Sequence, residues 1–355
     1  MMQMESVVRS AVQPTTDAPV MVTGASGYVA GWVVKGLLEL GVTVHATVRD
    51  SSKPSSVNHL KAAANVLPGT LKFFDANLLN EGDFDEAMKG CEIVIHTASP
   101  FTQHVKDPQR DLIDPALKGT RNVLGSVEKT ASVKRVVLTS SIAAMYTDAV
   151  ECEHMPGGML SPESWNTTAS LTYEPYHYSK TLAERAAWEL QRQGRGWELV
   201  VINPALVVGP SLNPVPTSES FGIVRQLMRG DMMAGAPRLG LSLVDVRDVA
   251  EGHIAAAFVP EANGRNIIAG KDCDLCWAGM ELRKYLPVSK AWRLPRWPMP
   301  KAAFVVLAPA VGVSRQFAEN NVDHVVRCDT TKSREELGIT YRDPIEAMAH
   351  MTDQL

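Results

Sequence analysis

The sequence predicts an α/β fold, a doubly wound parallel sheet followed by a smaller, mostly helical C-terminal lobe. From residue 19 to residue 204, short apolar runs alternate with amphipathic segments and no internal repeat is visible, which is typical of parallel strands joined by helices. Beyond that point the alternation stops, and prolines at 204, 210, 214 and 216 break the chain into loops. The change of pattern indicates a second lobe.

We expect a disordered tail over residues 1–17 and a nucleotide-binding domain over 18–205, to which 242–268 returns. The substrate-binding lobe then comprises 206–241 and 269–355. Of the residues, 45% are hydrophobic and 21% charged, and the net charge is −4, so nothing marks a nucleic-acid partner. The longest apolar run, Ala302–Val313, is too short to span a bilayer, so we expect a buried or pocket-covering helix there. No export signal is evident, and a cytoplasmic location is expected.

The chain has five cysteines, an odd number that does not suggest a disulfide framework. Cys273 and Cys276 have the CxxC spacing, but no second pair and no nearby histidine completes a metal set. We therefore predict no metal site.

The first strand is expected at Pro19–Thr23, and it leads into a glycine-rich turn and an amphipathic segment, Trp32–Leu40. In this setting a GxxGxxA pattern indicates dinucleotide binding, because glycines let the backbone approach a pyrophosphate at the helix N-terminus. The residues expected to contact the cofactor here are Thr23, Gly24, Ser26, Gly27, Tyr28 and Val29.

The second expected strand, Val42–Val48, ends at Arg49. An arginine at this point suits the 2′-phosphate of NADP, whereas NAD sites place an acidic residue there. Lys53 could add a donor, and Asp50 is a complication because it is acidic and adjacent. The pattern favours NADPH over NADH.

The remaining elements alternate as a parallel sheet requires. Strands are expected at Leu71–Phe74, Cys91–His96, Lys134–Thr139 and Leu199–Ile202, and helices at Gly82–Gly90 and Arg110–Lys129. Small or polar residues follow several strand ends, where an open parallel sheet binds its ligand. Those expected to line the cofactor are Asn77, Leu78, Thr97, Ala98, Ser99, Thr139, Pro204, Ala205 and Val207.

Tyr176 and Lys180 are four residues apart, so they share one face of a helix. The ammonium is expected to lower the pKa of the phenol, which could then exchange a proton with a carbonyl oxygen. Ser141, delivered by the fifth strand, could donate to the same oxygen. The Tyr/Lys spacing alone is weak, because exposed helical pairs are common; its meaning depends on the cofactor pattern.

Together these motifs resemble the extended short-chain dehydrogenase/reductases. Within them the chain resembles the dihydroflavonol and cinnamoyl-CoA reductase branch with its microbial aldehyde and carbonyl reductases. The segments that carry the resemblance are Thr23–Tyr28, Ala46–Asp50, Phe84–Ala87, His96–Phe101, Arg135–Ser141, Tyr176 with Ser179-Lys180, Ala183–Glu189 and Asn203–Pro210. The resemblance implies a Rossmann fold and NADPH-dependent reduction of a small carbonyl compound, by a monomer or homodimer. It also implies roles for the site residues. Tyr176 would be the proton donor, Lys180 would hold the nicotinamide ribose, Ser141 would orient the carbonyl and Arg49 would bind the 2′-phosphate.

Three departures from the family pattern bear on substrate. Dihydroflavonol reductases carry an Asn five residues after the catalytic Ser, where this chain has Tyr146; with Phe101 and Ile142 it suggests an apolar pocket. The Asn-Trp that precedes the tyrosines in cinnamoyl-CoA reductases is absent, which disfavours an acyl-CoA. Asn77 replaces the usual Asp at the adenine edge. We therefore expect a broad-range reductase of apolar or aromatic aldehydes and ketones.

Several alternatives stay open. The chain could be a cinnamoyl-CoA or dihydroflavonol-type reductase, or a sugar-nucleotide epimerase or hydroxysteroid dehydrogenase on the same fold. A non-catalytic sensor of NADP(H) is a further alternative, but it would not need the Ser141, Tyr176 and Lys180 set. His177 is expected to point away from the Tyr176/Lys180 face.

Overall fold

The computed structural model describes residues 6–9, 12–99, 105–215 and 218–355. Within them, the larger unit is a seven-stranded sheet in the order β10-β6-β5-β4-β1-β2-β3, with every neighbouring pair parallel. The strand order reverses between β1 and β4, the point at which doubly wound folds bind their ligands. The strands are β1 (Val20–Thr23), β2 (Thr43–Val48), β3 (Thr70–Asp75), β4 (Ile93–His96), β5 (Arg135–Thr139), β6 (Glu198–Pro204) and β10 (Gly264–Ile268).

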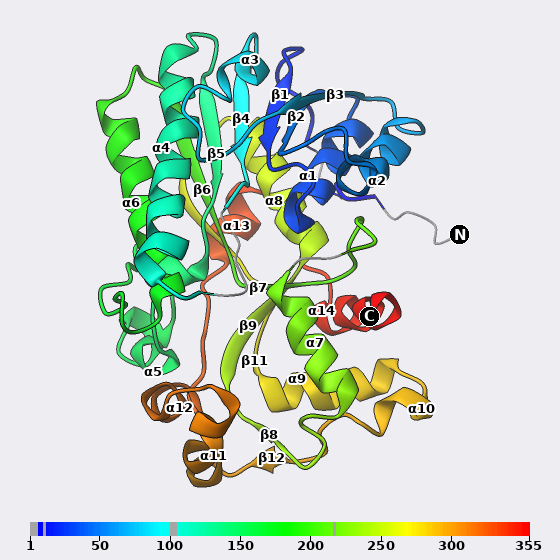
Figure 1. Ribbon diagram of the computed structural model, residues 1–355, viewed down its shortest axis with the longest axis vertical. Coiled ribbons are helices and arrows are strands. Elements are labelled where there is room, and N and C mark those ends of the chain that lie inside the picture. The colour runs from blue at the N-terminus through cyan, green and yellow to red at the C-terminus, as the bar shows by residue number, and fades with distance from the viewer. Residues whose placement is uncertain (1–5, 10–11, 100–104, 216–217) are drawn as a thin grey trace.

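Helices cover both faces of this sheet (Figure 1). On one face α4 (Asp114–Lys129) packs beside α6 (Pro175–Gln193), with α3 (Asp85–Met88) above α4. On the other face α1 (Tyr28–Glu39) packs between α2 (Pro54–Ala64) and α8 (Val246–Phe258). The predicted doubly wound α/β fold is confirmed.

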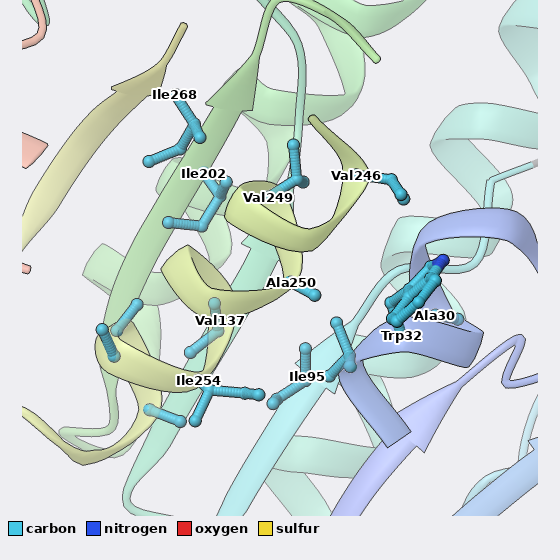
Figure 2. Close-up of a cluster of buried hydrophobic side chains, with 14 of the residues drawn as sticks. Ala30, Trp32, Ile95, Val137, Ile202, Val246, Val249, Ala250, Ile254 and Ile268 are labelled. Atoms are coloured by element: carbon cyan, nitrogen blue, oxygen red, sulfur yellow. The ribbon is translucent and has the colours of Figure 1, made fainter. Parts of the chain in front are cut away.

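Side-chain alternation along the strands divides the core into two clusters. On β4, for example, Ile93 and Ile95 belong to the cluster on the α1 and α8 side, whereas Val94 belongs to the cluster on the α4 and α6 side. Figure 2 shows the first cluster, where Val249 and Ile254 of α8 lie over the sheet.

The smaller lobe is built on a three-stranded sheet in the order β11-β9-β7, formed by β7 (Leu206–Val208), β9 (Gly240–Asp245) and β11 (Lys271–Asp274). A third core cluster joins this sheet to α7 (Glu219–Arg229), α9 (Leu275–Leu282) and α14 (Pro344–Met351). The shorter elements are α5 (Ala149–Cys152), β8 (Ala236–Pro237), α10 (Val288–Ala291), β12 (Pro298–Met299), α11 (Lys301–Leu307), α12 (Arg315–Asn321) and α13 (Thr331–Glu336).

The division between the two units is more interleaved than the sequence suggests. Of the segment expected to return to the larger sheet, α8 and β10 do so, while β9 belongs to the lobe. Residues 326–342, expected in the lobe, pack on the larger unit through Val326, Leu337 and Ile339.

The N-terminal segment differs from the disordered tail expected over residues 1–17. Val7 is fully buried in the core beside α1 and α8, and the Arg9 backbone N–H donates to Glu251 of α8 at 2.8 Å. The Arg342 guanidinium donates to the Ser6 carbonyl oxygen at 3.1 Å. For residues 6–9 the expectation is therefore wrong, because contacts with residues far along the chain hold this segment in place.

The apolar run Ala302–Val313 was expected to form a buried or pocket-covering helix, and this is wrong. None of the α11 residues is buried, and Val306 is 70% exposed. The helix has seven residues and packs chiefly against α12 and the turn that follows it, so most of its surface has no protein neighbour.

Candidate active site

The carboxyl ends of the central strands meet the start of α6, and there the structure brings Ser141, Tyr176 and Lys180 together. Pro175 occupies the first turn of α6, where its missing N–H costs nothing. The preceding residue, Glu174, has a left-handed backbone with φ 50°, an uncommon conformation for a non-glycine residue. Inside α6, Tyr176 and Lys180 are four residues apart and so share one side, with the Lys180 Nζ 5.8 Å from the centre of the Tyr176 ring.

Of the two serines after β5, only Ser141 faces the tyrosine. Its hydroxyl accepts from the Ala143 N–H at 3.1 Å, which fixes its orientation, and it acts on the Tyr176 phenol by lowering its pKa. The Ser140 hydroxyl is buried and donates to Glu184 Oε2 at 2.5 Å.

The pKa values do not follow the expected pattern. The pKa of Tyr176 is raised to about 12, chiefly by burial and then by the Glu219 carboxylate, while Ser141 acts in the opposite direction. Tyr176 as a whole is 42% exposed, but the surroundings of its hydroxyl are buried. The pKa of Lys180 is lowered to about 8 by burial, against the effect of the nearby Glu184. The predicted lowering of the Tyr176 pKa by Lys180 is therefore wrong for the chain without ligands, because burial dominates and Lys180 is not among the groups that shift this pKa.

A buried ionic network lies directly beneath these residues. The Glu184 carboxylate, one turn after Lys180, accepts from Arg265 Nε at 2.6 Å and from Asn203 Nδ2 at 2.9 Å. The same Asn203 amide donates to the Ser141 carbonyl oxygen at 3.2 Å. Glu184 thus connects α6 to the loop that carries Ser141.

Arg265, on β10, is the cation of this network and is almost fully buried. It donates to the Pro162 carbonyl oxygen at 3.0 Å and to the Ser164 carbonyl oxygen, and its guanidinium stacks on the Trp165 ring with 4.1 Å to the centroid. Several hydrogen bonds therefore compensate its burial, as a buried charge requires.

The glycine-rich turn after β1 has the geometry of a dinucleotide cradle. Gly24 has φ 62°, and a Cβ added there would lie 3.1 Å from Ala98 backbone and side-chain atoms. An added Cβ at Gly27 would lie 3.1 Å from the Gly24 carbonyl oxygen. Only glycine fits these positions, so the backbone stays open to a ligand at the start of α1. The residues fit a pyrophosphate.

Thr23 and Thr97 hold this cradle from inside. The Thr23 hydroxyl is buried, lies 2.8 Å from His96 Nδ1 and accepts from the Ala98 N–H at 3.0 Å. The Thr97 hydroxyl donates to the Thr23 carbonyl oxygen. Next to them, Ser99 accepts a hydrogen bond from Lys180 Nζ at 3.2 Å, which connects the cradle to the Tyr176 site.

The end of β2 presents an exposed arginine. Arg49 makes no ion pair with the described residues. The Asp50 carboxylate accepts a hydrogen bond from the Ser52 hydroxyl at 2.6 Å and pairs with Lys53 at 3.6 Å. These contacts hold the Asp50 carboxylate within its own loop. Asn77 is exposed, and Leu78 packs against α4 at Gly119.

The other residues expected at the cofactor lie deeper. The Thr139 hydroxyl is 2.6 Å from His253 Nε2, and burial lowers the pKa of His253 to about 4, so this imidazole is neutral at physiological pH. Pro204 ends β6, Ala205 is buried and Val207 packs against the core. Ser26, Tyr28 and Val29 begin α1 half-buried, and the Tyr28 hydroxyl donates to the Gly209 carbonyl oxygen at 2.7 Å.

The expected substrate pocket is described in part. Tyr146 is half-buried with its ring edge-to-face against His177, 5.9 Å between centroids, and the same imidazole lies 6.0 Å from the Tyr176 ring. His177 therefore sits between both tyrosines rather than pointing away from them. Ile142 is buried in the core, and Phe101 lies outside the described residues.

Three residues at the site were missed at the sequence level: Glu184, Arg265 and Glu219. Glu184 could have been found from its spacing, because it lies one helical turn after Lys180 on the same face of the helix. No sequence pattern identifies Arg265 or Glu219, since only the fold brings β10 and the start of α7 to the Tyr176 site.

The comparisons with known proteins agree with this geometry. The family model "NAD dependent epimerase/dehydratase family" matches residues 20–270. The chain belongs to this family. The resemblance to extended short-chain dehydrogenase/reductases is thereby confirmed, and the residues matched extend from β1 through β10.

Several of the similar proteins are named as reductases. Cinnamoyl-CoA reductase CAD2 of Medicago truncatula is 46% identical over 252 residues, 70% of this chain and 75% of that protein. The bifunctional dihydroflavonol 4-reductase/flavanone 4-reductase of Malus domestica is 34% identical over 76% of each chain. The crystal structure of the yeast methylglyoxal/isovaleraldehyde reductase with NADPH matches with a TM-score of 0.73 and 28% identity, over 95% of this chain and 97% of that one.

The family member is thus a reductase of the short-chain type, acting on carbonyl groups with a nicotinamide cofactor. In the part of the chain that the structure describes, no helix has the length and apolarity to cross a membrane.

Burial raises the pKa of Cys273 to about 12, so its thiol is protonated near neutral pH.

Proposed function

We propose that this family member reduces aldehydes or ketones to alcohols with NADPH, with a preference for apolar or aromatic substrates. The observation that carries the proposal is the position of Lys180, whose Nζ lies 5.8 Å from the centre of the Tyr176 ring and donates to Ser99 beside the glycine cradle at 3.2 Å, with Ser141 close enough to act on the Tyr176 phenol. A proton donor, an orienting hydroxyl and a dinucleotide site then meet at one sheet edge.

Bound NADPH would supply the hydride that attacks the carbonyl carbon. The residues of the chain would orient the carbonyl group and supply the proton. Ser141 holds the carbonyl oxygen beside the Tyr176 hydroxyl, and Tyr176 gives its proton to that oxygen as negative charge develops there. A pKa of about 12 keeps Tyr176 protonated at neutral pH, as a proton donor must be. Lys180 would bind the nicotinamide ribose and, when protonated, stabilise the phenolate left behind.

The cofactor preference follows from the end of β2. Arg49 is exposed and forms no ion pair with any described residue, and the Asp50 carboxylate is engaged by Ser52 and Lys53, so this site favours a 2′-phosphate. We expect Arg49→Ala to raise the KM for NADPH by about 10- to 100-fold through loss of charge-assisted hydrogen bonds. The KM for NADH should barely change.

Steady-state kinetics with both cofactors tests this prediction. Lys89→Ala, at an exposed lysine on the same domain, is the matched control and should leave both KM values alone. An equal rise in the KM for NADPH and NADH in Arg49→Ala would assign Arg49 to structure rather than to the phosphate.

Glu219 gives a prediction on pH. Its carboxylate raises the pKa of Tyr176, so Glu219→Gln should lower that pKa. In the reverse reaction, alcohol oxidation with NADP⁺, the phenolate is the base, and the rate increases with pH until the phenol is ionised. The rise in kcat/KM should therefore move to lower pH in Glu219→Gln.

The pH dependence of kcat/KM for alcohol oxidation tests this prediction. Glu86→Gln, an exposed glutamate of α3, should leave the profile in place. A Glu219→Gln profile that coincides with wild type, or shifts to higher pH, would show that this carboxylate does not act on Tyr176.

The test of the function itself follows NADPH absorbance with an aromatic aldehyde, an α-dicarbonyl, a dihydroflavonol and an acyl-CoA. Turnover of the first two supports the proposal. NADPH binding without consumption would favour a sensor or an epimerase.

A second candidate is reduction of an acyl-CoA thioester to the aldehyde. It is favoured by the 46% identity with a protein named cinnamoyl-CoA reductase, although the Asn-Trp pair of that branch is absent here. Turnover of the acyl-CoA alone in the same assay would select it.

A further inference from the structure

The far end of the lobe combines positive charge with exposed apolar side chains. From residue 282 to residue 318 the sequence has no Asp or Glu, although the chain as a whole has a net charge of −4. In this stretch, called the basic end below, the cations are Arg283, Lys284, Lys290, Arg293, Arg296, Lys301 and Arg315. A one-sided charge distribution of this kind acts on a partner through its field.

The basic end also carries large apolar side chains in solvent. Trp292 is 46% and Trp297 53% exposed, and Val306 of α11 is 70% exposed. Val288, Leu307 and Val311 are exposed as well. Figure 1 shows α10, β12 and α11 along the end of the lobe opposite the central sheet. Patches of exposed tryptophan and aliphatic residues mark interaction sites.

Several cations of the basic end form no ion pair with the described residues of the protein. Within the described ranges, Arg296 and Arg315 are exposed and make no ion pair, and Arg293 lies over the Trp292 ring, 5.4 Å from its centroid. Lys284 and Lys290 do pair, with Glu281 and Asp353. Three exposed guanidinium groups are thus available on the basic end, among its exposed apolar side chains.

The positive charge of the basic end favours an anionic partner. A second copy of this chain, docked symmetrically through the basic end, would place like charges against each other. An anionic bilayer instead offers phosphate and carboxylate groups to guanidinium, and an interface where tryptophan rings and short amphipathic segments lie. We propose that the basic end docks the protein on anionic membrane surfaces.

The contact is peripheral. α11 has seven residues and no described helix could span a bilayer, so Val306, Leu307 and Val311 would enter only the headgroup boundary. The attraction of exposed cations is screened by salt, so binding should weaken as ionic strength rises. The proposal stands on the surface alone and does not depend on the reaction.

Co-sedimentation with two kinds of vesicle tests the proposal, phosphatidylcholine alone and equal parts of phosphatidylcholine and phosphatidylserine. The wild-type protein should sediment with the anionic vesicles only. Arg293→Gln and Arg296→Gln should each weaken binding by about fivefold, the share of one basic residue at such a surface. Val306→Asp with Val311→Asp should abolish it.

Matched controls carry the same changes elsewhere. Val66→Asp alters a valine that is 73% exposed beyond α2, and Lys89→Gln removes an exposed cation; both should bind as wild type. Three results would overturn the proposal: no binding to either vesicle, equal binding to both, or binding that the basic-end variants leave unchanged. So would a dimer, seen by sedimentation velocity without lipid, that Val306→Asp dissociates.

Discussion

Tyr176→Phe is expected to lower kcat/KM for carbonyl reduction by about 10²- to 10⁴-fold, the usual contribution of a positioned general acid. The substitution removes the hydroxyl, which is the only titratable group of the side chain, and leaves the ring in place. Tyr176 is 42% exposed, so loss of its hydroxyl should not unfold the chain. Binding of NADPH, followed by fluorescence titration, should change by less than about twofold, since the phenol acts on the substrate.

Tyr178→Phe is the matched control, because this tyrosine lies two residues further along α6 and away from Lys180. It should retain most of the activity. If Tyr176→Phe kept near wild-type activity, or if both variants lost it equally, proton donation by Tyr176 would be refuted.

The largest effect on stability is expected for Arg265→Leu. Its guanidinium is the buried partner of Glu184, and both side chains are almost completely inaccessible. The variant leaves a carboxylate buried without its cation, which costs about 3–5 kcal/mol of unfolding free energy. Burial without a partner also favours protonation of Glu184, so the loss should be greatest at neutral and higher pH.

Urea unfolding followed by circular dichroism measures this loss as a lower midpoint. The double variant Arg265→Leu with Glu184→Leu removes both charges and should recover much of the stability. Lys89→Leu, which breaks an exposed pair with Glu86, should cost at most about 1 kcal/mol. An Arg265→Leu midpoint equal to that of Lys89→Leu would show that the buried pair does not stabilise the fold.

Much of the fold could be predicted because it follows from local patterns. Apolar runs bounded by glycine-rich or small residues mark β1, β4, β5 and β6, and the sequence pattern at Gly24 and Gly27 defines the turn whose close contacts the structure shows. Ser141, Tyr176 and Lys180 could be brought together because parallel strands end at one edge and a helix repeats about every fourth residue.

The remainder depends on contacts between distant segments, which local patterns do not encode. Arg265 bonds to Glu184 across 81 residues, and Val7 near the N-terminus packs beside α8, which begins only at Val246, so neither could be placed from the sequence. The shift of the Tyr176 pKa was predicted with the wrong sign, because it is set by burial that only the folded chain creates. For α11, apolar composition suggested burial, yet none of its residues is buried among the described parts of the chain.

The most direct test of the central claim is to run the reaction with an aromatic aldehyde and NADPH carrying deuterium at both C4 positions of the nicotinamide. The alcohol is then isolated and examined by mass spectrometry and NMR. We predict one deuterium on the carbinol carbon for each NADPH consumed, and none with Tyr176→Phe beyond its residual turnover. An alcohol without deuterium, or NADPH that stays unoxidised while bound, would contradict the assignment of this chain as an NADPH-dependent carbonyl reductase.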